Sequence, residues 1–291
     1  MSAQAAHRLR AIPADLDAAA VTDVDTRLAE VRRDHGVTIC FAIESGSRAW
    51  GFPSPDSDHD CRFVFVRALN AYLSPWPLRE VIETPLDGLL DVNGWDLGKA
   101  LKLLLKGNAV IVEWLMSPIV YDADAQTVED LRAFAERFAS RNGIAQHYLH
   151  LGEKQRRTYF ADGKDVQLKK LFYALRPAAA LRWLRLHPDR KIAPMHFPTL
   201  MAECAPPHDV AAITSALIAR KAETRELGAA PLPRPIEAFV DGEFEAARRA
   251  FPATPAAPSA EAKHEADRLF RSTLLRSAEG PASTFRAALA T

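Results

Sequence analysis

The sequence contains few cysteines and no long apolar run. Cys40, Cys61 and Cys204 are its only cysteines, and their spacing matches no metal-binding pattern. No apolar run approaches the ~20 residues that a helix needs to cross a bilayer. Residues 1–20 also lack the apolar core of a signal peptide. These absences argue against a disulfide-stabilised secreted protein and against a membrane protein, so we expect a reduced, cytoplasmic protein.

The sequence also lacks an excess of charge of either sign. It has 37 Lys and Arg against 37 Asp and Glu, so its formal net charge is zero. A neutral chain is unlike a protein that binds nucleic acid over its whole surface, although a local basic patch is compatible with it. An apolar content of 48% and a charged content of 25% are ordinary for a globular protein. The length of 291 residues suits one large or two modest domains.

Two apolar runs, at 37–43 and 61–66, flank the polar segment around which the chain is organised. The first run has the length of a buried strand and ends at the small-residue turn SGS. The second run follows directly after Asp58 and Asp60. Alternate residues of a strand share a face, so these two carboxylates are expected to point the same way. They repel each other unless a cation lies between them, and Mg²⁺ prefers such oxygen ligands.

A Gly-Ser turn at one strand end and an Asp-x-Asp pair at the start of the next predict a nucleoside triphosphate site. Gly46 and Ser47 are expected to contact the phosphates, while metal ions bridge protein and substrate. Arg48 could contact a phosphate or be an ordinary surface arginine. Arg62 could contact the triphosphate or neutralise the carboxylates. The alternative for the whole segment is a surface hairpin with a solvated turn, which the apolar character of 61–66 disfavours.

These residues resemble a known family. Gly46-Ser47, then ten residues, then Asp58-x-Asp60 is similar to the signature of the DNA polymerase β-like nucleotidyltransferases. The sequence SGSRAWGF…DSDHDCRF resembles the bacterial and phage group that includes RNA-repair-associated polymerase β-like proteins. The segments DVNGWDLGKALKLLLKGNAVIVEWLMSPIVY and LKKLFYALRPAAALRWL extend the resemblance. His59 departs from the aliphatic residue that many of these proteins carry, and we expect it to be a structural histidine.

The resemblance implies a site with two Mg²⁺ or Mn²⁺ ions and a third carboxylate on a neighbouring strand. Asp91 is the favoured candidate, so Asp58, Asp60 and Asp91 are the expected metal ligands and catalytic residues. Asp96 competes for this role, but it is better placed to cap a helix expected at 97–106.

The two halves of the sequence differ in their patterns. Strand and helix signals mix up to residue 122, and only helix signals are found after it. We therefore expect an α+β protein with a small mixed-sheet nucleotidyltransferase domain at 1–122 and an all-helical domain at 123–291. A helix expected at 23–35 would cover one face of the sheet, and Gly36 would end it.

Basic and aromatic residues alternate over 151–191, a combination that suits phosphate contacts. On a helix expected at 168–186, Lys169, Tyr173 and Arg176 form one stripe. They are expected to close over the triphosphate from the helical half. The alternative is a helix whose aromatic residues face the core and whose cations are solvated.

The sequence thus predicts a metal-dependent nucleotidyltransferase that moves a nucleoside monophosphate from an NTP to a hydroxyl and releases pyrophosphate. The resemblance implies a nucleic-acid acceptor, an RNA end. One alternative is transfer to a protein or a small molecule, as in antitoxin-like or aminoglycoside-type members of the superfamily. Another is a catalytically inactive nucleotide-binding module.

Overall fold

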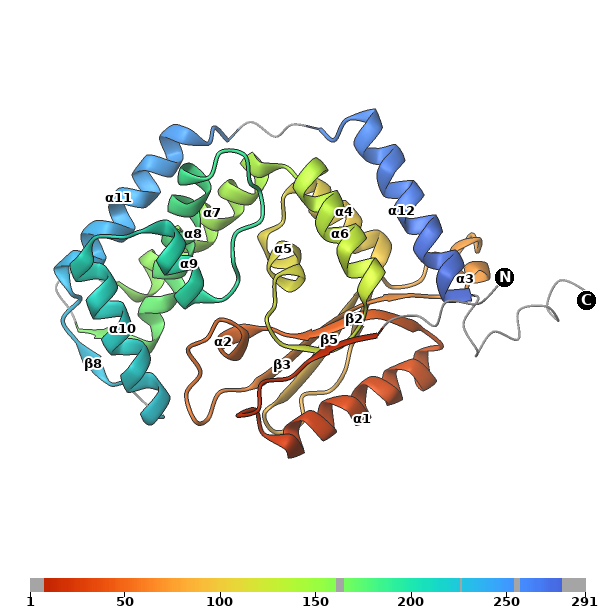
Figure 1. Cartoon of the computed structure of the whole chain (residues 1–291), viewed down its shortest axis with the longest axis horizontal. Helices are drawn as coiled ribbons and strands as arrows, with labels where there is room; N and C mark the ends of the chain where they lie inside the picture. Colours follow the sequence, from red (N-terminus) through yellow and green to blue (C-terminus); the bar gives the residue numbers. More distant parts are fainter. Residues whose placement is uncertain (1–7, 161–164, 226, 254–256, 279–291) are drawn as a thin grey trace, which may run out of the picture.

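The computed structural model describes residues 8–160, 165–225, 227–253 and 257–278 (Figure 1). A six-stranded sheet lies at its centre. Its strands are β1 (Arg8–Ala11), β2 (Thr38–Glu44), β3 (His59–Val66), β4 (Val81–Glu83), β5 (Leu90–Asp96) and β6 (Val120–Asp124).

The sheet is mixed, with the strand order β1-β6-β2-β3-β5-β4. All neighbouring strands are antiparallel except β3 and β5, which run parallel. A parallel pair needs a crossover connection, and here the short helix α3 (Leu69–Tyr72) and strand β4 lie between the two strands in sequence. The expected α+β class with a mixed sheet is confirmed.

Helix α1 (Ala18–His35) covers one face of the sheet and lies below it in Figure 1. The Asp17 carboxylate caps the helix by accepting a hydrogen bond from the Ala19 N–H at 2.9 Å. Gly36 ends it in the left-handed conformation at φ +58°. The apolar cluster between helix and sheet includes Val24, Leu28, Val31, Cys61, Phe63, Phe65, Val92 and Tyr121.

The opposite face of the sheet carries the other helices. Those nearest to it are α4 (Leu97–Lys106), α5 (Ala109–Leu115) and α6 (Ala125–Phe138). The helical part continues with α7 (Arg141–Tyr159), α8 (Leu168–Leu186), α9 (Phe197–Cys204), α10 (His208–Glu223) and α11 (Arg234–Ala250). Helix α12 (Ala260–Ala278) then returns to pack on α4 and α6 (Figure 1). One apolar cluster joins this face of the sheet to the helical part. No helix in the described ranges is both long enough and apolar enough to cross a membrane.

Several strands differ from the sequence expectation. Strand β6 extends beyond residue 122, after which helix signals alone were expected, and it pairs with β1 and β2 inside the sheet. Its sequence VYDAD is short and two of its five residues are acidic, so pairing with neighbours rather than composition makes it a strand. In the helical part, β7 (Val166–Gln167) pairs with β8 (Ala229–Ala230). The final residues, from 279 on, lie outside the described ranges.

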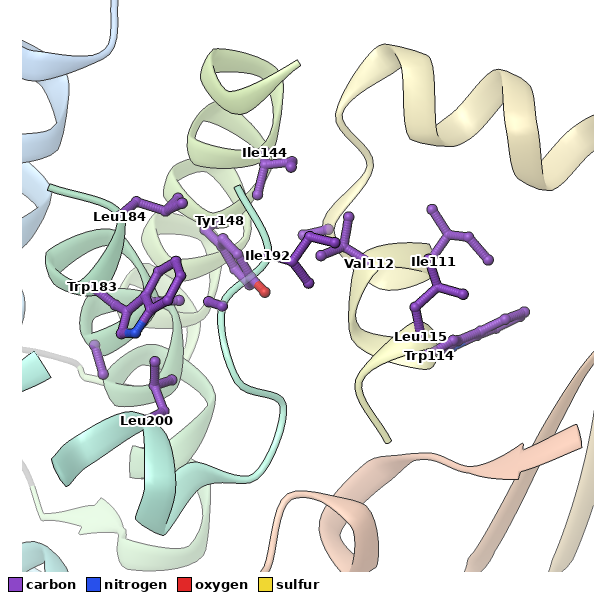
Figure 2. Packing of buried hydrophobic residues seen from close by; sticks show 14 of the residues in the cluster. Ile111, Val112, Trp114, Leu115, Ile144, Tyr148, Trp183, Leu184, Ile192 and Leu200 are labelled. Carbon is purple, nitrogen blue, oxygen red and sulfur yellow. The ribbon is translucent and has the colours of Figure 1, made fainter. Parts of the chain in front are cut away.

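A buried ion pair lies where the helical part meets the sheet domain. Arg176 Nη1 of α8 lies 2.6 Å from Glu113 Oε1 of α5, and both side chains are less than one-tenth exposed. The Tyr148 hydroxyl donates to the same carboxylate oxygen at 2.8 Å. Figure 2 shows Tyr148 and Val112 pointing toward each other, with Ile192 between them. The two charges are therefore surrounded by packed apolar side chains, so water does not screen the attraction between them.

We predict that Glu113→Ala strongly destabilises the fold. The variant leaves the Arg176 guanidinium buried without its counter-charge and removes the acceptor of the Tyr148 hydroxyl, a loss of about 3–5 kcal/mol. The matched control is Glu245→Ala, because Glu245 forms an exposed pair with Arg249 one helical turn away; its expected cost is at most about 0.5 kcal/mol. Urea denaturation measures both values, and equal costs would contradict the structural role of the buried pair.

Candidate active site

The Gly-Ser turn lies directly against Asp60, the aspartate of β3. Gly46 adopts φ +62°, and a Cβ atom at this position would lie only 2.1 Å from Asp60 Oδ2. The Ser45 N–H also donates to the Asp60 carbonyl oxygen at 2.8 Å. Glycine therefore suits this position by its backbone conformation, and a Cβ here would displace the Asp60 carboxylate. The turn leads into the short helix α2 (Gly46–Ala49).

The parallel pairing of β3 and β5 brings two carboxylates together. Asp60 is in register with Asp91, and Arg62 with Asn93. The alternate residues of these strands, such as Cys61 and Val92, belong to the apolar cluster between α1 and the sheet. Asp60, Arg62, Asp91 and Asn93 therefore share the other face of the sheet, which is turned toward the helical part.

Arg62 lies between the two carboxylates. Its Nη2 is 3.0 Å from Asp60 Oδ1 and 2.7 Å from Asp91 Oδ2, while Nη1 donates to the Asp91 carbonyl oxygen at 2.9 Å. Burial raises the pKa of Asp60, which the Arg62 guanidinium partly opposes. Of the two roles that the sequence left open for Arg62, the structure shows the neutralisation of the carboxylates.

Asp58 lies one residue before β3 and is exposed. Strand alternation alone therefore does not align it with Asp60, although its charge contributes to the raised pKa of Asp60. Arg48 supports this loop: its Nε donates to the Asp58 carbonyl oxygen at 3.0 Å and its Nη2 to the Ser57 carbonyl oxygen at 2.6 Å. Ser47 Oγ donates to Ser57 Oγ at 2.9 Å. The two side chains expected to contact phosphate thus hold the loop that carries Asp58.

Asp96 lies at the opposite end of β5 from Asp91. It is in register with Phe65, and its carboxylate caps α4 by accepting a hydrogen bond from the Gly98 N–H at 2.8 Å. The Tyr72 hydroxyl donates to its second oxygen at 2.6 Å. The cap expected from the sequence is confirmed, and Asp91 rather than Asp96 is the carboxylate beside Asp60.

The predicted stripe on α8 divides between the surface and the core. Tyr173 is about one-third exposed, with its ring 6.5 Å from that of Trp50. Arg176 is buried against Glu113, and its guanidinium lies 4.1 Å from the Trp50 ring. Both contacts are made inside the protein, so a direct role of Arg176 in binding a triphosphate stays a prediction. Arg176 supports Trp50, which follows directly after α2.

Lys169, the first residue of the stripe, lies near the loop between α2 and β3. The pKa of Asp56 in this loop is lowered mainly by a hydrogen bond with Ser54, and the charge of Lys169 adds to the effect. Lys169 is thus the member of the stripe whose charge acts on the residues between the turn and the aspartates.

Glu44 is a site residue that sequence reasoning missed. Its carboxylate is fully buried and accepts hydrogen bonds from the Asp60 N–H at 2.8 Å and the Tyr121 hydroxyl at 2.5 Å. Burial raises the pKa of Glu44 to about 7. Its bonds hold the backbone of Asp60 in place. The sequence signal was a carboxylate at the buried end of an apolar strand, which has to find a partner.

Lys221 of α10 is a second missed residue. It is buried, and its Nζ donates to the Phe52 carbonyl oxygen at 2.5 Å. Burial lowers the pKa of Lys221 to about 8. The bond ties the helical part to the loop that leads to Asp58. No sequence pattern predicted it, because residues 52 and 221 meet only in the folded chain.

The donor set fits a divalent cation that is partly coordinated by substrate. Arg62 shows that a positive charge is stabilised between Asp60 and Asp91, and Asn93 Oδ1 beside them is buried without a hydrogen-bond partner. Within the described ranges, no three His, Cys, Asp or Glu side chains form a ready-made metal cluster. Mg²⁺ typically binds one or two protein carboxylates together with phosphates and water.

We predict that Gly46→Ala costs more stability than Gly36→Ala. Both glycines have φ near +60°, but no atom lies within 4 Å of a Cβ at Gly36, so the control reports backbone strain alone, about 1–2 kcal/mol. Adding Asp60→Ala to each variant should remove the extra cost at Gly46 only. Urea denaturation of the four variants measures this, and equal costs in the two single variants would contradict the close contact.

We predict that Lys221 makes the stability depend on pH. Its folded pKa of about 8 lies below the ordinary value of 10.5, so the unfolded state binds the proton more tightly. The stability contribution is therefore lowest below pH 8 and rises as pH increases toward 10.5, by no more than about 3 kcal/mol. The free energy of unfolding of wild type minus that of Lys221→Met, measured by urea denaturation at pH 8, 9 and 10, should become more positive as the pH rises. A constant difference would contradict the shift.

Comparison with known proteins agrees with this geometry. A family model described as "RlaP: RNA repair pathway DNA polymerase beta family" matches residues 21–272. The chain is also 38% identical over 218 residues to the "Uncharacterized protein YcgL" of Bacillus subtilis (strain 168), an alignment that covers 75% of this chain and 83% of that protein. The family match spans the sheet and the helical part. The chain therefore belongs to the RNA repair pathway DNA polymerase beta family.

Proposed function

We propose that this protein is a metal-dependent nucleotidyltransferase that transfers a nucleoside monophosphate from an NTP to a hydroxyl group and releases pyrophosphate. One observation carries the proposal: the Gly46 backbone, the Asp60 carboxylate and the Asp91 carboxylate meet at one place on the sheet. A phosphate-binding turn and a metal-binding carboxylate pair must be adjacent for one substrate to engage both.

Asp60 and Asp91 would hold Mg²⁺ or Mn²⁺, with Asp58 entering from the adjacent loop. Two bound ions would neutralise phosphate charge and lower the pKa of the acceptor hydroxyl. Arg62, now paired with both carboxylates, would be released to pair with the triphosphate when cations take its place. Glu44 would keep the Asp60 backbone in position throughout, because its contact is with the main chain.

Substrate positioning falls to the groups around this face. Gly46 allows the backbone of the turn to approach the phosphates, while Ser47 and Arg48 keep the loop that carries Asp58 in place. Lys169 and Tyr173 of α8 would close the site from the helical part. We assign Arg176 an indirect role, since it is buried beneath Trp50.

We propose a nucleic-acid end, most directly an RNA end, as the acceptor. The support is the family description, which names RNA repair. The basic segment at 151–191 supports it less than its composition indicated, because Arg182 and Arg185 pair with Glu243, and Arg190 pairs with Glu136. Transfer to a protein or a small molecule is the competing proposal.

We predict that Asp60→Asn and Asp91→Asn each lower nucleotidyl transfer on the order of a hundredfold or more, because each weakens the charge that holds the cations. Purified protein is given each α-labelled NTP with Mg²⁺ or Mn²⁺ and short RNA and DNA oligonucleotides. Asp87→Asn is the matched control, since this exposed aspartate lies outside the site on the turn before β5. Circular dichroism verifies that each variant is folded.

The position of the label distinguishes the acceptors. Label on RNA in wild type and control, but not in the two site variants, supports the proposal. Label on the protein or on an added lysate protein assigns the enzyme to protein modification instead. Transfer that survives both site substitutions would overturn the assignment of the carboxylates, and no transfer with any acceptor would leave a nucleotide-binding module.

A further inference from the structure

Exposed apolar side chains gather at one edge of the sheet. Among the described residues, eight large apolar side chains are exposed, and five of them lie between residues 73 and 89, on both sides of β4 in sequence. Trp76 is 80% exposed and Leu86 70%. Such a concentration of exposed apolar residues around one edge strand indicates an interaction site. The five residues are Leu73, Trp76, Leu78, Leu86 and Leu89.

Strand β4 forms this edge, and its outer side pairs with no other strand among the described residues. Ile82 is in register with Gly94 of β5, the Asp96 N–H donates to Glu80, and the Thr84 N–H donates to Val92. Even-numbered residues of β4 therefore turn their N–H and C=O groups toward β5. By alternation, Val81 and Glu83 turn theirs outward. Such an edge is a template for another strand.

We propose that β4 pairs antiparallel with β4 of a second copy of this chain, giving a twofold-symmetric dimer. With Ile82 on the twofold axis, Val81 and Glu83 lie opposite the partner's Glu83 and Val81, where the outward-facing groups can exchange hydrogen bonds. Continued two residues beyond the paired segment 80–84, the same register places Leu78 opposite the partner's Leu86. The apolar residues before β4 thus meet those after it, which is the self-complementarity that a twofold interface requires.

The charges of the edge are compatible with this register. Arg79 faces the partner's Pro85, and Glu80 faces the partner's Thr84, so no two like charges lie directly opposite each other. Glu80, Glu83 and Asp87 pair within the chain with Lys102, Arg79 and Arg27, so these residues give the edge no excess of positive charge that would attract a nucleic acid.

Apolar surface next to the edge enlarges the proposed contact. A three-residue strand alone is too small for a stable interface, which buries roughly 1,200–2,000 Å² in total. A cavity of about 420 Å³ opens beside the segment that precedes β4. Pro77 and Leu78 line it together with Leu101 and Leu105 of α4 and Phe270 of α12. Because this recess lies beside Leu78, the apolar side chain that the register brings to it is the partner's Leu86, a residue that is 70% exposed in the single chain.

The test measures the mass of the full-length protein by sedimentation velocity over a hundredfold range of concentration. Wild type is expected to shift from monomer to dimer as the concentration rises. Leu78→Lys and Leu86→Glu are each expected to raise the dimer dissociation constant at least tenfold. The double variant Leu78→Lys/Leu86→Glu should recover most of that loss, because it places a cation opposite a carboxylate across the proposed interface.

Matched controls exclude a general effect of surface charge. Leu186→Lys and Leu186→Glu replace a leucine that is 47% exposed and lies at the end of α8, a helix that packs on α7, α9 and α11. They should leave the dissociation constant unchanged. A wild-type protein that stays monomeric at every concentration overturns the proposal, as does a dimer that the single edge variants do not weaken. A dimer that they weaken but the double variant does not recover overturns the register.

Discussion

The structure of the site depends on the pairing of one arginine with two carboxylates. Parallel β3 and β5 place Asp60 and Asp91 side by side on a half-buried surface, where their mutual repulsion would be costly. Arg62, on the same face, offsets that repulsion by contacting both. The site that we propose for divalent cations is thereby stable without them, and the arginine occupies the region in which added positive charge is most favourable.

A second pairing connects this site to the helical part. Glu113 and Arg176 are buried together, and Arg176 also lies against Trp50, which follows the Gly-Ser turn. Lys221 adds a contact from α10 to the Phe52 carbonyl oxygen. Residues distant in sequence therefore hold both ends of the segment that leads to Asp58. Burying these charged groups without partners would destabilise the fold, so each of them meets a defined partner.

Local sequence predicted the elements whose signals are strong. The apolar runs on either side of the Asp-x-Asp pair became β2 and β3, the helix at 168–186 matches α8, and Asp96 caps α4. Strand β6 was missed because its short acidic sequence becomes a strand only by pairing with β1 and β2. Asp58 was expected to share a strand face with Asp60, but β3 begins one residue after it.

The sequence by itself determined the chemistry of the site: a glycine that tolerates positive φ, a pair of aspartates and an arginine two residues further on. Only the tertiary structure decided which groups meet. The register of β3 and β5 selected Asp91 over Asp96, and burial took Arg176 into the core while leaving Tyr173 partly exposed. Glu44 and Lys221 depend on partners far away in sequence. Local patterns report which face a residue occupies, whereas long-range pairing and desolvation decide its neighbours.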